Sequence, residues 1–277
     1  SAAGVGVALL SSAAGVGVAL LSSAAGVGVH TAGSYRTDGY RRTASPKPVP
    51  PPPAPVYDAV VFDNDGVLVT VCEFSVFREA TRRAFEGFGV DPDPAEVEAV
   101  AGVAAPERIR EVCDRHGLDP ESFWRRRDRE ATLAQREAVR AGRKRPYDDI
   151  DVVRSLDART AIVSSNQHET IEFLLDRLDL RDAFDAYFGR EHSVAGVERK
   201  KPATHYLERA MSAIDADPER TLMVGDSDAD LRAARRAGVD SAFLRRAHRA
   251  EHDPSVAPTH ELSTLHDLRG LVGPPAD

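Results

Sequence analysis

The chain has 277 residues, of which 42% are hydrophobic and 6% aromatic, enough for one large hydrophobic core or two small ones. Its formal net charge is −8, which excludes a generally basic surface, so we expect no nucleic-acid partner. Two cysteines are too few for a disulfide scaffold and predict a reducing, cytoplasmic location.

Residues 1–55 differ from the rest of the chain. The string SAAGVGVALLS occurs at 1–11 and 12–22 and begins again at 23, and its frequent glycines argue against a stable helix. The stretch is uncharged up to Val29, but it lacks the basic start of a signal peptide and its small polar interruptions disfavour a membrane span, so we expect no membrane role. Prolines crowd 46–55. We predict a disordered low-complexity segment and linker.

The first strand is predicted at 59–62, where the apolar run AVVF is typical of a parallel strand buried on both faces. Asp63, Asp65 and Gly66 follow at its carboxyl end, where ligands bind in open α/β sheets. Two carboxylates about 4 Å apart repel by roughly 4 kcal/mol at an effective dielectric near 20. The pair therefore indicates a bound cation or a shared proton. An ordinary Asp-rich turn is the alternative.

Helices without strands are predicted between 74 and 141, where apolar residues recur at helical spacing between Gly and Pro. The charged run from Arg125 to Arg129 is interpreted as a solvated helix face. Some side chains of this segment could face either a site or solvent; they are Arg78, Arg82, Arg108 and Trp124.

Strands and helices then alternate. Strands are predicted at 158–166, 185–189, 220–228 and, as the final one, 239–244, with helices at 168–178, 203–214 and 229–238. Repeated βα units with apolar strands predict an α/β fold, a Rossmann-like parallel sheet covered by helices. A helical insert after the first strand is expected over the carboxyl ends of the strands.

Polar residues follow two later strands. Ser164, Ser165 and Asn166 precede a helix, where they could bind a phosphate or cap the helix. Several carboxylates, which include Asp226, Asp228 and Asp230, come after the apolar run 222–224 at a loop and helix start; their hard oxygen ligands suit Mg²⁺. Asp228 by itself is interpreted as a helix cap.

Lysine is rare in this chain. Of 36 basic residues only four are lysine, and two of them, Lys200 and Lys201, stand before Pro202 at a predicted helix start. Because arginine supplies the general surface charge, a site that keeps lysine points to a need for a compact ammonium. A surface pair without function is the alternative.

The order of these motifs resembles the haloacid dehalogenase-like (HAD) hydrolase superfamily. FDNDGVL, IVSSN, KKP and VGDSDADLRAARRAG occur in the order and spacing typical of its phosphatase branch, which includes phosphoglycolate phosphatases and carries a helical cap after the first motif. The resemblance spans 57–246. It implies a core formed by 56–70 and 146–277, and an all-helical cap domain at 71–145.

The resemblance also implies catalytic roles. Asp63 would be the nucleophile that takes the phosphoryl group, and Asp65 the general acid and base. Ser164 would bind the transferring phosphate and Lys201 would offset charge. Ser165 and Lys200 remain the alternatives to these last two, and Thr204 departs from the family's proline two positions after Pro202.

A magnesium site is implied as well. Its ligands would be Asp63, the backbone carbonyl of Asp65, and Asp226, with Asp230 supporting the metal or the lysine. Gly66 would let the backbone approach the phosphate closely.

The predicted function is a Mg²⁺-dependent phosphatase that hydrolyses a small phosphorylated metabolite through an aspartyl phosphate. Asp65 argues against dehalogenation, and Lys144 is the one lysine of the insert that a phosphonatase could use, at its very end. A phosphosugar mutase with the same motifs is the alternative, and a phospho-accepting signalling or binding module is a third. The oligomeric state is not predicted.

Overall fold

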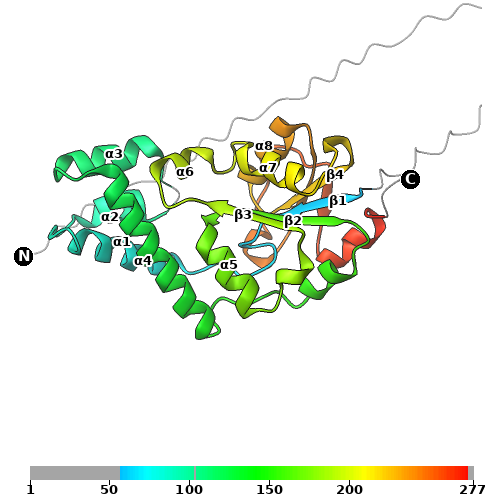
Figure 1. The fold of residues 1–277 in the computed structure, drawn as a ribbon, viewed down its shortest axis with the longest axis horizontal. Helices are drawn as coiled ribbons and strands as arrows, with labels where there is room; N and C mark the ends of the chain where they lie inside the picture. Colours follow the sequence, from blue (N-terminus) through cyan, green and yellow to red (C-terminus); the bar gives the residue numbers. More distant parts are fainter. Residues whose placement is uncertain (1–56, 103, 274–277) are drawn as a thin grey trace, which may run out of the picture. The chain divides into compact units, whose positions relative to one another are not determined.

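A computed structural model describes residues 57–102 and 104–273 (Figure 1). The repeat and the proline-rich linker predicted for residues 1–55 lie outside the described residues. Among the described residues, no helix is both long and apolar enough to cross a membrane.

A sheet of six parallel strands forms the centre of the described region, in the order β3-β2-β1-β4-β5-β6. The predicted α/β fold with a parallel, helix-covered sheet is confirmed. One prediction is wrong, because the strand expected to be last is followed by β6, which pairs with β5. The strands are β1 (Ala59–Phe62), β2 (Arg159–Gln167), β3 (Ala186–Arg190), β4 (Thr221–Gly225), β5 (Asp240–Leu244) and β6 (His260–Leu262).

The register of the strands places the polar segments that follow the apolar runs of β1, β2 and β4 next to one another. Phe62 at the end of β1 pairs with Ile162 of β2 on one side and with Val224 of β4 on the other. The carboxyl ends of β1 and β4 and the carboxyl-terminal part of β2 therefore lie at the same edge of the sheet. This edge is where the sequence places its acidic and hydroxyl side chains.

Helices cover both faces of the sheet, as Figure 1 shows. One apolar cluster joins Val60 and Phe62 of β1 to Ile171 and Leu174 of α5, and the other joins Val61 to Leu207 of α7. Alternate β1 residues thus point to opposite faces, and both faces are buried. The helices after β2 are α5 (His168–Arg177), α6 (Val194–Arg199), α7 (His205–Ala213) and α8 (Asp228–Ala237).

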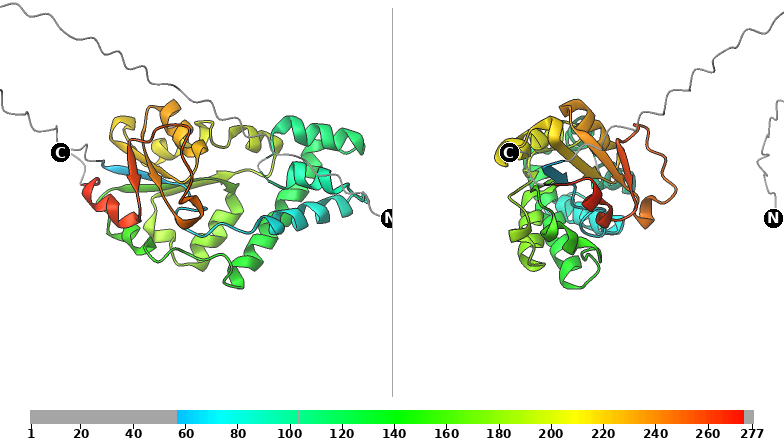
Figure 2. Two further views of the ribbon diagram at one scale, coloured as in Figure 1. Left: turned by 180° about the vertical axis from the view of Figure 1, so that it is seen from behind. Right: turned by 90° about the vertical axis from the view of Figure 1, so that its right-hand side faces the viewer.

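Four helices between β1 and β2 form what we call the helical insert. They are α1 (Phe74–Glu86), α2 (Pro94–Ala101), α3 (Pro106–Arg115) and α4 (Pro120–Arg140). The insert has its own apolar cluster, in which the rings of Phe85 and Phe123 lie 4.5 Å apart. The left view in Figure 2 places the insert, coloured cyan to green, beyond the strand ends opposite the red C-terminal segment. That it is a separate cap domain stays a prediction.

The solvated helix face expected at Arg125–Arg129 is only partly present. Arg127 and Asp128 are buried, because α4 turns this side towards the core. The Asp128 carboxylate accepts a hydrogen bond of 2.7 Å from the guanidinium of Arg190 on β3, and Arg127 stacks over Trp124. The interpretation was wrong for these two residues because Asp128 pairs both with Arg127 and with Arg190, which lies 62 positions later.

Candidate active site

Asp63 lies at the carboxyl end of β1 in contact with a buried lysine. The Lys201 ammonium is 2.8 Å from Asp63 Oδ1 and 2.6 Å from Asp230 Oδ1, and it donates to the Val163 carbonyl at 2.8 Å. Burial lowers the pKa of Lys201, but the carboxylates of Asp230 and Asp63 outweigh this and the net pKa lies above its ordinary value. Lys201 is therefore a fixed positive charge between two strand ends.

Three carboxylates converge at this edge. Carboxylate oxygens of Asp63, Asp226 and Asp230 all lie within 4.8 Å of one another. Burial raises the pKa of Asp63 well above its ordinary value; Lys201 opposes this shift, and the neighbouring carboxylates add to it. A cation at this point would relieve the repulsion, and hard oxygen donors are the ligands that Mg²⁺ prefers. The residues present therefore fit a magnesium ion.

Asp65 belongs to a second group of contacts. Its carboxylate touches the buried ammonium of Lys144 and accepts hydrogen bonds from the amides of Asn166 at 2.9 Å and Asn64 at 3.2 Å. Burial would raise the pKa of Asp65, but Lys144 outweighs it together with these amides, so the net pKa is lowered. The two aspartates of the motif thus lie in different environments, one held by Lys201 and one by Lys144.

Known proteins resemble this chain in sequence and in fold. The family model for haloacid dehalogenase-like hydrolases matches residues 57–238. The chain belongs to this family. Among curated relatives, the pyrophosphatase PpaX of Anoxybacillus flavithermus is 24% identical, over 78% of this chain and 97% of that protein. The phosphoglycolate phosphatase of Aquifex aeolicus is 31% identical, over 36% of this chain and 46% of that protein. Among solved structures, CbbY of Rhodobacter sphaeroides in complex with phosphate has a TM-score of 0.59 at 23% identity, covering 78% of this chain and 99% of CbbY.

In this HAD hydrolase, Gly66 permits a close backbone approach beside the acidic group. Its φ is 85°, and a Cβ atom there would lie 2.3 Å from Asp226 Oδ2 and 2.9 Å from His248 Nε2. A larger residue would have to displace the Asp226 carboxylate, so the sequence needs glycine here for two reasons.

Gly66→Ala should therefore destabilise the protein more than an alanine at an open position with similar φ. Gly142 has a φ of 71° and no atom within 4 Å of an added Cβ. We expect Gly142→Ala to lower the free energy of unfolding by about 1 kcal/mol, and Gly66→Ala by about 1–2 kcal/mol more. Urea unfolding of both variants measures the difference, and equal losses would contradict the close contact.

A cavity of about 300 Å³ opens beside Asp65, between the HAD core and the helical insert. Its lining includes five apolar side chains from the insert and its leading linker: Val71, Cys72, Phe74, Phe77 and Trp124. Arg127, Arg190 and Lys200 also line it and add positive charge. The cavity has room for a small molecule whose phosphate would point at the strand ends.

The lysine and serine alternatives occupy different places. Lys201 contacts Asp63, whereas Lys200 donates to the Ala104 carbonyl at 3.2 Å and lines the cavity. Ser164 is buried within β2, where its hydroxyl accepts a hydrogen bond of 3.1 Å from the backbone N–H of Asn166, and Ser165 lines the cavity. The phosphate-binding role of Ser164 stays a prediction.

For four side chains of the insert the sequence did not decide between a site and solvent, and the structure gives them different surroundings. Arg78, Arg82 and Arg108 are exposed and pair with glutamates of the insert, while Trp124 is buried and lines the cavity. Only Trp124 is therefore available to a ligand in this cavity.

The loop after β4 differs from the prediction in one detail. Ser227, not Asp228, caps α8: its backbone N–H donates to Asp230 at 3.1 Å. Asp228 instead accepts a hydrogen bond of 2.7 Å from the Ser255 amide. Ser227 precedes the first helical residue and thus was the better cap candidate.

Sequence reasoning missed His248. Its Nε2 lies 2.6 Å from Asp226 Oδ2, and Arg249 Nε lies 3.4 Å from the same oxygen. One signal could have found both residues: they follow β5, whose carboxyl end lies at the same edge of the sheet as β1 and β4.

Proposed function

We propose that this HAD hydrolase is a Mg²⁺-dependent phosphatase that cleaves a small phosphomonoester through an aspartyl phosphate. The observation that carries the proposal is the contact of Asp63 with Lys201, within the group of three carboxylates and beside the cavity that Asp65 lines. The nucleophile Asp63, the compensating charge of Lys201 and the proton donor Asp65 would thus lie together at one edge of the sheet.

In the first step, a carboxylate oxygen of Asp63 attacks phosphorus and the bond from phosphorus to the leaving oxygen breaks. Asp65, which must enter this step protonated although Lys144 favours its carboxylate form, gives that oxygen a proton, so the product is an alcohol. A carboxylate that approaches a phosphate dianion faces about two repulsive charge pairs, roughly 8 kcal/mol at an effective dielectric near 20. The fixed ammonium of Lys201 reduces this barrier without reorganisation.

In the second step, water attacks the phosphorus of the aspartyl phosphate. Asp65, now a carboxylate, accepts a proton from the water, and the bond between phosphorus and the Asp63 oxygen breaks. Phosphate leaves and Asp63 returns as a carboxylate. The net reaction consumes one ester and one water and yields one alcohol and one phosphate.

Asp63, Asp226 and the backbone carbonyl of Asp65 would hold the magnesium ion, with Asp230 supporting Lys201. When bound, Mg²⁺ supplies charge neutralisation for the carboxylates and for the phosphoryl oxygens. The carboxylate cluster and the family support this choice of metal.

The substrate would be a small phosphorylated metabolite with a partly apolar body. The volume of the cavity and its apolar walls support this class, and its three cationic side chains favour a further negative charge on the substrate. Relatives named as a pyrophosphatase and as a phosphoglycolate phosphatase support release of free phosphate, in preference to the transfer that a phosphosugar mutase performs.

A screen tests this function. The purified protein is given a set of small phosphate esters and pyrophosphate, with Mg²⁺ or with excess EDTA, and free phosphate is measured. We expect release from at least one compound, loss of release in EDTA and recovery on adding Mg²⁺. Phosphate that remains on a rearranged sugar would identify a mutase, and equal release with EDTA would contradict the metal requirement.

A further inference from the structure

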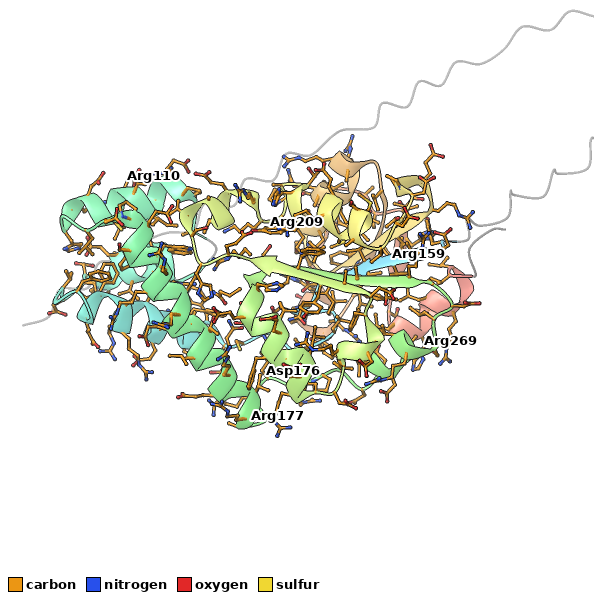
Figure 3. The ribbon with its side chains drawn as sticks, viewed as in Figure 1. Arg110, Arg159, Asp176, Arg177, Arg209 and Arg269 are labelled. Atoms are coloured by element: carbon orange, nitrogen blue, oxygen red, sulfur yellow. The ribbon has the colours of Figure 1, made fainter. Side chains whose placement is uncertain are left out.

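Lysines gather at the candidate active site. Lys144, Lys200 and Lys201 are the only lysines in the described region, and all three lie at this site: one touches Asp65, one lines the cavity and one touches Asp63. Many arginines instead lie at the surface, as Arg110, Arg177 and Arg269 do in Figure 3, although Arg127 and Arg190 are buried. The proposed function uses Lys201 and gives Lys144 no task.

The placement of Lys144 depends on both linkers between core and insert. The Thr70 amide donates to the Arg145 carbonyl at 2.8 Å, and the Tyr147 amide donates to the Leu68 carbonyl at 3.1 Å. This pairing carries Lys144 back to Asp65 across 79 positions of sequence. The side chain of Lys144 is fully buried.

Lys144 is also held from its other side. Its ammonium donates to Gln135 Oε1 at 3.0 Å, and Asn166 Nδ2 donates to the same oxygen at 2.7 Å. Gln135 lies on α4 and is buried. One amide oxygen of the insert therefore positions two of the donors that Asp65 accepts from.

The three donors around Asp65 do not use all the acceptor sites of its carboxylate. A carboxylate has about four acceptor sites, and Lys144, Asn166 and Asn64 fill three of them. Asp65 still lines the cavity, so the remaining site can carry the proton that passes to a leaving oxygen, or accept a proton from a water. Burying an ammonium is costly unless it is paired, and an apolar side chain would be easier to accommodate at this position.

From this geometry we infer that Lys144 is a positioning residue, which with Gln135 holds the carboxylate of Asp65 in the orientation that proton transfer to the leaving oxygen requires. The inference rests on the proposed function, since it assigns a part in the same reaction. Lys144 acts through Asp65 and does not touch the phosphoryl group.

The test compares two esters of similar size with different leaving groups. The leaving oxygen of p-nitrophenyl phosphate departs without a proton, whereas that of benzyl phosphate needs one. The quantity measured is kcat/KM, which covers only the steps up to loss of the leaving group. We expect Lys144→Met to lower kcat/KM for benzyl phosphate about 100-fold and for p-nitrophenyl phosphate less than about 10-fold. Asp65→Asn should show the same selectivity.

Arg145→Met is the matched control. Arg145 is the next residue, and within the described part of the chain its exposed side chain pairs only with the exposed Asp148. We expect its two kcat/KM values to remain within twofold of the wild type. Equal losses for both esters in Lys144→Met would show a merely structural role, and no loss for either would show no role; both results would overturn the inference.

A double variant covers the case in which Lys144→Met fails to fold. Asp65→Asn with Lys144→Met removes both charges of the pair, so no buried charge is left alone. If Lys144 acts through Asp65, the double variant should match Asp65→Asn alone in its ratio of kcat/KM values. A further change of at least about tenfold in that ratio would contradict the inference. If the wild type hydrolyses neither ester, the proposed function fails instead.

Discussion

Asp63→Asn should lower kcat/KM for phosphate ester hydrolysis at least about 10⁴-fold, the scale of losing a nucleophile. The amide keeps the size of the side chain but cannot attack phosphorus, and water would have to do so without covalent help. Initial rates of phosphate release, measured for the best substrate of the screen at saturating Mg²⁺, test this prediction.

Asp228→Asn is the matched control for this variant. Asp228 belongs to the same acidic motif as Asp226, but its carboxylate accepts hydrogen bonds from Ser255 and lies outside the group of three carboxylates. We expect its activity to stay within about twofold of the wild type. Full activity in Asp63→Asn would show that another group attacks phosphorus.

Lys201→Met should reduce both stability and activity. It removes the ammonium between Asp63 and Asp230 and leaves two buried carboxylates without their cation. Breaking a buried pair in this way costs about 3–5 kcal/mol in the free energy of unfolding. Because the pKa of Lys201 is raised on folding, the stabilisation is complete below the unfolded pKa and is lost only as the pH rises through the folded pKa. Urea unfolding at pH 7 without added metal therefore measures the full effect.

The neighbouring lysine provides the control for stability. Burial lowers the pKa of Lys200 to about 8, so its ammonium opposes folding at pH 7. Lys200→Met should leave the free energy of unfolding unchanged or raise it. If both substitutions had the same effect, the assignment of Lys201 as the paired lysine would be contradicted.

The sequence was sufficient to predict the sheet and its edge. The apolar runs before Asp63, Ser164 and Asp226 indicate buried parallel strands, and parallel strands bring their carboxyl ends to one side. The proximity of Asp63, Lys201 and Asp226 follows from that topology. At these positions the residue types predict a site and the order of strands predicts that the residues meet, so the sequence was enough to locate them.

Other contacts depend on packing that no local pattern records. Asp65 meets Lys144 because two linkers pair across 79 positions, and Asp128 is buried because Arg190 neutralises it from another strand. A charged run on a helix is usually solvated, so its burial has no signature in the run itself. His248 likewise contacts Asp226 from the turn after β5, and nothing in the residues around His248 indicates that contact.

We expect Asp63 to take the phosphoryl group from the substrate. The most direct measurement is mass spectrometry of Asp65→Asn after acid quench from p-nitrophenyl phosphate and Mg²⁺, conditions in which the leaving group departs but water is not activated. We predict one phosphoryl group on the peptide that contains Asp63, and none when Asp63→Asn is added. A phosphoryl group on a different residue, or nitrophenol release that continues with no modified peptide, would contradict the account.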